Sequence, residues 1–194
     1  MIDEVSTRLG AWLARGANAA SGVTTFYDTP TDADRDDAVA TMIWNAWFRE
    51  LSDGVYADED IGAVLALDPR FMRITSLTRM LDGRGAGNTE NLASFDVATN
   101  ESAFFDDRNT AVVESSREIV LAALVRALDA LTATPNFPGN GGFGTTDMDQ
   151  WLWGLRHYVV FDSLIKAFAG DVSGIELISS DVAVAPRTLP LVPE

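Results

Sequence analysis

The sequence has no cysteine, which excludes disulfide bonds, thiolate metal sites and cysteine nucleophiles. It has a single histidine, His157, so a zinc site with three histidine ligands is excluded as well. No stretch approaches the roughly 18 consecutive apolar residues of a membrane-spanning helix. No basic segment followed by an apolar one comes after Met1, so we expect no signal peptide in these 194 residues.

Basic residues are also scarce. Lysine and arginine together number 14 against 29 aspartates and glutamates, which gives a formal net charge of −15, and Lys166 is the one lysine. A surface this negative repels phosphate backbones and anionic lipids, so we expect neither nucleic acid nor a membrane as a partner. Apolar residues make up 47% of the chain, which is enough for one folded domain with its own core.

The spacing of the apolar residues predicts a mainly α fold, an irregular assembly of several helices. Apolar side chains recur at steps of three and four residues, and Gly16 and Gly54 are predicted to end the first two helices. The predicted helices cover residues 7–15, 32–53, 58–67, 70–81 and 110–131. We expect residues 1–194 to form a single helical domain, in which residues 182–194 are an extended, proline-containing tail.

Other segments are assigned by composition. Glycine and proline predict loops at residues 82–90 and 134–146, and residues 91–105 fit neither a helix nor a strand clearly. For residues 148–168 a helix is the first prediction. A strand at Tyr158–Phe161 stays open as the alternative, because that stretch is rich in β-forming residues.

Two short motifs fail the tests for ligand binding. Residues 32–37 alternate carboxylates as a calcium loop does, but an EF-hand loop needs glycine and glutamate where this chain has Asp37 and Ile43. Residues 83–87 are rich in glycine, but they lack the Gly-Lys-Ser/Thr ending of a phosphate-binding loop. We interpret the first motif as an acidic helix start and the second as an ordinary loop, and we expect neither a metal nor a cofactor.

The string Phe105-Asp106-Asp107 places two carboxylates side by side ahead of a predicted helix. A carboxylate pair can serve as general acid and base, as in glycosidases. The simpler interpretation is that Asp107, Asn109 or Thr110 caps the following helix by accepting a hydrogen bond from its free backbone amides. We favour the capping role.

The least ordinary string contains Trp151, Trp153, Gly154, Arg156 and His157 within seven residues. Large apolar rings with polar tips are typical of an anchor, either to the protein's own core or to another surface. We interpret His157 as a packing residue. A small enzyme that uses His157 with a carboxylate is a weaker hypothesis.

Together these strings resemble a stretch of the β-chain of penicillin-acylase-type amidases. The most specific match is the family pattern Trp-x-Trp-Gly-x-x-His with an aromatic residue shortly after it, here Phe161. Weaker matches occur in the same order along the chain, at Leu9-x-x-Trp12, residues 44–51, Phe104–Asp107 and residues 119–128.

The resemblance implies an N-terminal-nucleophile hydrolase. In such enzymes the precursor cuts itself, the new N-terminal serine of the β-chain attacks an amide carbonyl, and an oxyanion hole stabilises the intermediate. The implied substrates are acyl amides, such as β-lactam side chains or acyl-homoserine lactones. The implied location of the parent enzyme is the periplasm or the outside of the cell.

The match begins after the family's nucleophile and oxyanion groups, and this chain starts with Met1-Ile2. We therefore expect a helical fragment of a β-chain that has no catalytic residue and is inactive alone. Its motif residues are expected to be structural; they are Phe105, Asp106, Asp107, Trp151, Trp153, Gly154 and His157.

The expected partners are the α-chain and the rest of the β-chain of the parent enzyme. A homodimer of the isolated fragment is a further expectation, because apolar surface meant for the missing parts would be exposed. The alternative to the hydrolase is a stand-alone α-helical module that binds a protein partner through its tryptophans without catalysis.

Overall fold

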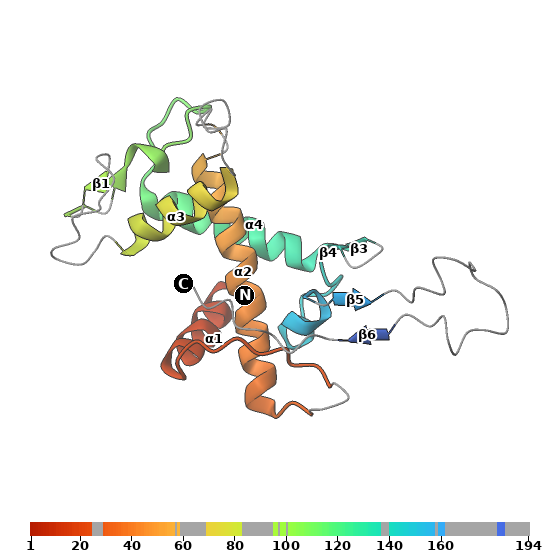
Figure 1. The fold of residues 1–194 in the computed structure, drawn as a ribbon. Coiled ribbons are helices and arrows are strands. Elements are labelled where there is room, and N and C mark those ends of the chain that lie inside the picture. Colours follow the sequence, from red (N-terminus) through yellow and green to blue (C-terminus); the bar gives the residue numbers. More distant parts are fainter. Residues whose placement is uncertain are drawn as a thin grey trace. The chain divides into compact units, whose positions relative to one another are not determined.

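The computed structural model describes residues 1–24, 29–56, 58, 69–82, 95–96, 98–99, 101–136, 140–157, 159–161 and 182–184. These residues form a mainly helical protein, as predicted. The α-helices are α1 (Ile2–Ala14), α2 (Asp32–Tyr56), α3 (Pro69–Asp82) and α4 (Ser116–Thr132), and they are shown in Figure 1.

Short elements join the helices. Single 3-10 turns occur at η2 (Ala103–Phe105), η3 (Met148–Gln150) and η4 (Trp153–Leu155). Three antiparallel pairs of short strands complete the described structure. They pair β1 (Phe95–Asp96) with β2 (Glu101–Ser102), β3 (Pro135–Asn136) with β4 (Asn140–Gly141), and β5 (Val159–Phe161) with β6 (Val182–Val184).

The chain comprises two compact units. Unit 1 contains Met1–Trp44 and Leu131–Glu194, and unit 2 contains Asn45–Ala130. The expectation of a single domain over residues 1–194 stays a prediction. Among the described helices, none combines the length and the apolar character that crossing a bilayer requires.

Unit 1 is built on α1 and the first part of α2. Burial of Val5, Leu9 and Trp12 marks one face of α1, because these residues recur at helical spacing. The helix ends at Ala14, and Gly16 follows with a φ of +94° that favours glycine. The prediction that Gly16 stops this helix is therefore confirmed.

A capping box begins α2. The backbone N–H of Asp34 donates to the Thr31 hydroxyl over 3.2 Å, and the Asp34 carboxylate accepts from the Thr31 backbone N–H over 2.8 Å. The hydrogen bonds from the Thr31 hydroxyl and backbone lower the pKa of Asp34. The acidic motif at residues 32–37 is thus part of a helix, as we interpreted it.

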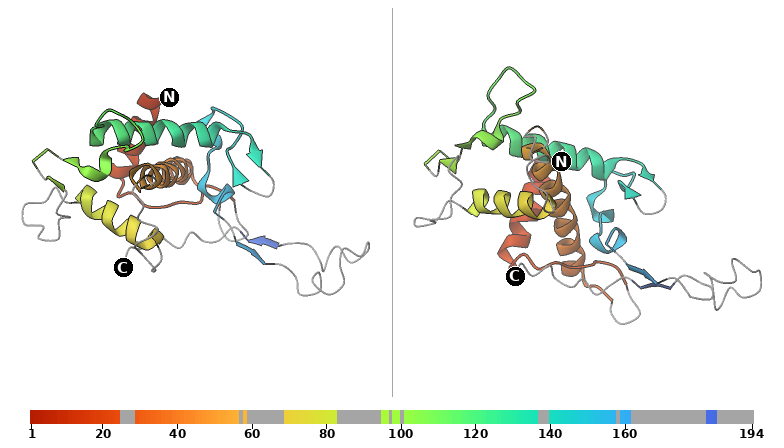
Figure 2. Two further views of the ribbon diagram at one scale, coloured as in Figure 1. Left: turned by 90° about the horizontal axis from the view of Figure 1, so that it is seen from above. Right: turned by 45° about the horizontal axis from the view of Figure 1, so that its top comes forward.

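Unit 2 has a core between three helices. Figure 2 shows the second part of α2 between α3 and α4 in its left view. Buried side chains from all three helices and from η2 fill the space; they are Leu51, Val55, Tyr56, Leu77, Met80, Phe105, Ile119 and Ala123.

Three helix boundaries differ from the predictions, and the first of them is the start of α1, which lies at Ile2 and not at residue 7. The second helix does not end at Gly54, because Val55 and Tyr56 are buried and hold another half turn in place. The fourth helix begins at Ser116 and not at residue 110, because Ser115 caps it: the Glu118 backbone N–H donates to the Ser115 hydroxyl over 3.4 Å, and the Ser115 backbone N–H donates to the Glu118 carboxylate over 2.8 Å. The hydrogen bond from the Ser115 backbone N–H lowers the pKa of Glu118 most, and the one from the Ser115 hydroxyl lowers it further.

The predicted helix over residues 148–168 is wrong in its described part. The described residues between 148 and 161 include η3, η4 and β5, so the strand alternative is the better one over residues 159–161. Buried contacts at Trp151 and Gly154 fix a non-helical path there. Of the predicted helix at residues 58–67 the structure describes only Asp58, which lies in a turn; residues 59–67 and the glycine-rich loop at residues 83–87 lie outside the described residues.

Candidate functional site

The tryptophan string, defined as residues 151–157, lies in unit 1 against the segment Ser21–Val23. Gly154 is buried, and its backbone N–H donates to the carbonyl oxygen of Ser21 over 2.8 Å. A Cβ atom at position 154 would lie 2.7 Å from Cγ2 of Val23 and 2.8 Å from the Ser21 oxygen. Because atoms in a close-packed interior do not approach so closely, this contact requires glycine.

Gly22 allows a second close approach, between the same segment and α2. Its φ of +69° lies in the left-handed region that favours glycine. An added Cβ atom would lie 2.5 Å from Cβ of Ala38 and 3.0 Å from Cδ2 of Leu152. The two glycines therefore let α2, the segment and the tryptophan string pack in contact.

Trp151 is the buried anchor of the string. Its side chain has no exposed surface, and its indole N–H donates to the carbonyl oxygen of Thr145 over 3.0 Å. The turn that precedes it, η3, is capped by Asp147, whose carboxylate accepts from the backbone N–H of Asp149 over 3.2 Å. A buried tryptophan with a satisfied N–H contributes both apolar area and orientation.

The rest of the string makes aromatic and cationic contacts. The Arg156 guanidinium lies 4.5 Å from the centre of the Phe143 ring and donates to the Gly142 carbonyl oxygen. The rings of Trp153 and His157 stack with centroids 4.7 Å apart and planes 12° apart. These contacts agree with a packing role for His157, which nevertheless has an exposed side chain.

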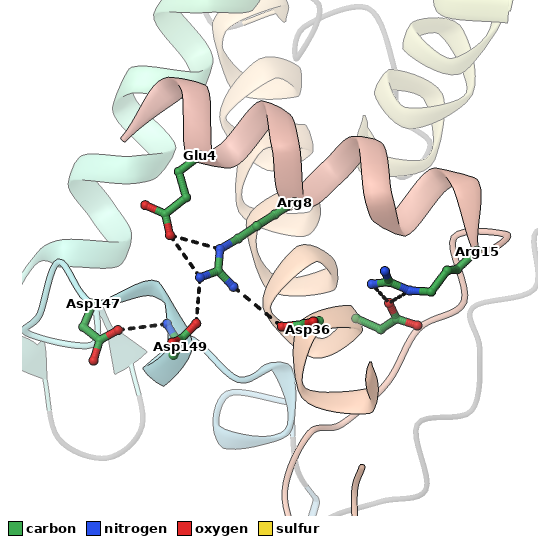
Figure 3. Close-up of polar contacts among 7 residues, drawn as sticks. Glu4, Arg8, Arg15, Asp36, Asp147 and Asp149 are labelled. Carbon is green, nitrogen blue, oxygen red and sulfur yellow. Dashed lines mark hydrogen bonds and ion pairs between the residues drawn. The ribbon is translucent and has the colours of Figure 1, made fainter. Parts of the chain in front are cut away.

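A charged cluster lies beside η3. Arg8 of α1 pairs with Glu4 over 3.0 Å, with Asp149 over 2.7 Å and with Asp36 of α2 over 3.9 Å, as Figure 3 shows. Burial alone would lower the pKa of the Arg8 guanidinium, because it disfavours the charged form. The hydrogen bonds to Asp149 and Glu4 have the larger combined effect, so the pKa is raised. A pocket of about 370 Å³ opens here, lined by Glu4, Thr7, Arg8, Ala11, Arg15, Asp36 and Asp149.

No sequence motif identifies this cluster as a whole. The spacing of Glu4 and Arg8 is a readable signal, because residues four apart lie on one helix face. Asp149 follows Arg8 by 141 positions. No local pattern connects residues so far apart, and only the folded path of the chain brings them together.

The other predicted motif, at residues 105–107, belongs to unit 2. Phe105 is 2% exposed and part of the core. The Asp107 carboxylate accepts from the backbone N–H of Asn109, and its own backbone N–H donates to Glu114, both over 3.0 Å. Thr110 donates to the same Glu114 over 2.7 Å.

These contacts stabilise the loop before α4. Hydrogen bonds from Thr110 and then from the Asp107 backbone lower the pKa of Glu114. The prediction that Asp107, Asn109 or Thr110 caps the helix is wrong, since Ser115 does so. One oxygen of Asp106, Oδ1, is buried without a hydrogen-bond partner among the described residues.

Comparison with known families decides the classification. The penicillin amidase family model matches residues 9–186. The chain belongs to the penicillin amidase family. Neither the comparison with curated proteins nor that with solved structures gave a match.

The penicillin amidase match covers all seven predicted motif residues. Trp151, Trp153, Gly154 and His157 share the local site in unit 1, whereas residues 105–107 lie in unit 2. Their structural role stays a prediction. In the described part of this penicillin amidase family chain, no three histidine, aspartate or glutamate side chains gather as metal ligands.

Proposed function

We propose that this chain is the helical segment of an amidohydrolase that cleaves acyl-amide bonds. The family match over residues 9–186 is the observation that carries the proposal. The proposed substrates are those of penicillin-acylase-type enzymes, namely β-lactam side chains or acyl-homoserine lactones. The proposed location of the parent enzyme is the periplasm or the outside of the cell.

The proposal assigns the chemistry to groups outside these residues. An N-terminal serine supplies the hydroxyl that attacks the amide carbonyl, and its α-amino group takes the proton. The α-amino group then passes this proton to the leaving amine, and water hydrolyses the acyl ester and restores the serine hydroxyl. This chain acts as structural scaffold. The hydrogen bonds of Trp151 and Gly154 to other residues of the chain support this role.

The contacts of His157 support the same assignment. Its ring lies flat on Trp153, and its backbone N–H donates to the Trp153 carbonyl oxygen over 2.9 Å.

The proposed partners are the α-chain and the rest of the β-chain of the parent enzyme. The isolated chain is proposed to self-associate, and the exposed apolar side chains Leu121 and Val125, one turn apart on α4, support this. Sedimentation velocity tests the second proposal. A dimer is the expected result, and a clean monomer at micromolar concentration contradicts it.

The coding DNA around this chain tests the hydrolase directly. We expect an in-frame upstream extension with a Gly/Ala-Ser-Asn cleavage site. The protein expressed from the whole frame should release the chromophore from a phenylacetyl or fatty-acyl anilide, and replacement of the new serine by alanine should abolish the release. A promoter and a stop codon directly before Met1 would instead favour the stand-alone interaction module.

A further inference from the structure

The tryptophan string is held to the rest of unit 1 from two directions. On one side, the buried N–H of Gly154 bonds the backbone of Ser21. On the other side, η3 is tied by the ion pair between Asp149 and Arg8. Both helical turns of this stretch are only three residues long, so neither is stable without such contacts.

Arg8 is the sheltered member of its cluster. Its side chain is 21% exposed, whereas the side chains of Asp36 and Asp149 are 63% and 74% exposed. The three carboxylates around it come from α1, α2 and η3, and Figure 3 shows them converging on one guanidinium. Arg8 therefore joins three elements, whereas an ordinary surface pair joins two.

A second arginine on the same helix provides an internal comparison. Arg15 pairs with Asp37 of α2, and its Nε donates to the carboxylate over 2.8 Å. Both residues lie outside the tryptophan string and outside η3. Removing either arginine changes the net charge by the same amount, but only Arg8 contacts the turn that leads to Trp151.

The pocket beside Arg8 gives solvent and ions access to the cluster. Exposed charges are screened by salt, and the screening length falls to about 3 Å at 1 M ionic strength. The Gly154 contact is buried and uncharged, so salt does not screen it. The two attachments of the string therefore differ in their response to ionic strength.

We propose that Arg8 is a positioning residue that holds η3, and with it the start of the tryptophan string at Trp151, against α1, and that this end of the string opens locally when the Arg8–Asp149 pair is broken or screened. The opening is a local unfolding event, in which the amides of η3 and of the string exchange with solvent while the helices stay folded. The ion pair adds to the Asp147 cap of η3 and to the hydrogen bond between Trp151 and Thr145, so its loss increases the extent of opening.

Amide hydrogen exchange measured on the peptide covering residues 147–157 tests the proposal. Arg8→Met keeps the apolar stem but removes the charge, and at low salt it should speed exchange of this peptide about two- to fivefold, the range expected for loss of one exposed pair. Arg15→Met is the matched control and should leave the peptide unchanged. In about 1 M NaCl the difference between wild type and Arg8→Met should shrink.

A second variant changes Asp149, the exposed partner of the pair. Asp149→Asn removes the partner charge without altering the core, and it should speed exchange of the same peptide as Arg8→Met does. Arg8→Lys keeps the charge but loses the planar fork, so it should restore part of the protection. Unchanged exchange in both Arg8→Met and Asp149→Asn, or equal acceleration by Arg15→Met, would overturn the proposal.

Discussion

Replacing Gly154 with alanine is expected to destabilise unit 1 by overpacking. The added methyl group would lie 2.7 Å from Cγ2 of Val23, 2.8 Å from the Ser21 oxygen and 3.1 Å from Cβ of Ser21. The Ser21 oxygen cannot move away freely, because it accepts the hydrogen bond from position 154 itself. Overpacking of this kind costs about 1–3 kcal/mol, which lowers the melting temperature of a chain of this size by about 3–10 °C.

Thermal unfolding followed by circular dichroism and tryptophan fluorescence measures this effect. Gly10→Ala is the matched control, because Gly10 lies inside α1 and an added Cβ there would meet nothing within 4 Å. That variant should gain about 0.5–1 kcal/mol, since alanine is the better helix former. A Gly154→Ala protein that melts within about 1 °C of wild type would refute the packing argument.

Three further predictions concern caps and buried groups. Thr31→Ala should lower the free energy of unfolding in urea by about 1 kcal/mol, because α2 loses its cap. A carbon-13 NMR titration of this variant should show the pKa of Asp34 returning toward its ordinary value. An unchanged pKa would contradict the capping box. The lowered pKa of Asp34 also means that its contribution to stability is present above the unfolded pKa and is lost as the pH falls through the folded one. Tyr56→Phe should cost about 1 kcal/mol through loss of the bond to Ser76. Because burial raises the pKa of Tyr56, the wild type should also lose stability as the pH rises past 10.0, and the variant should lose less; equal alkaline curves would count against this. Ser115→Ala should fray the start of α4, seen as faster amide exchange there, and an unaltered rate would remove Ser115 as the cap.

The sequence predicted helices well where cap residues and apolar spacing agree. The acids at residues 32–37 mark the start of α2, and Pro69 begins α3 as prolines do at a first helical position. The start of α4 was placed too early. Val112 and Val113 continue the apolar composition, but they are 68% and 81% exposed, and the cap at Ser115 decides the boundary.

The candidate site could be predicted only in part. The tryptophan string was recognised from its composition, whereas its path was not, because contacts of Gly154 and Gly22 with distant residues override the local helical pattern. For the same reason, the Arg8 cluster could not be predicted from the sequence. Pairing between α1 and η3 is a property of the fold, and no spacing rule connects positions 8 and 149.

The central proposal is that residues 1–194 of this penicillin amidase family protein do not contain the groups that cleave an acyl amide. The most direct test is the release of chromophore from a phenylacetyl anilide by the purified chain. The account predicts a rate equal to that of buffer alone. Turnover of the anilide by the purified chain would contradict it, and loss of that turnover in the His157→Ala variant would assign it to His157.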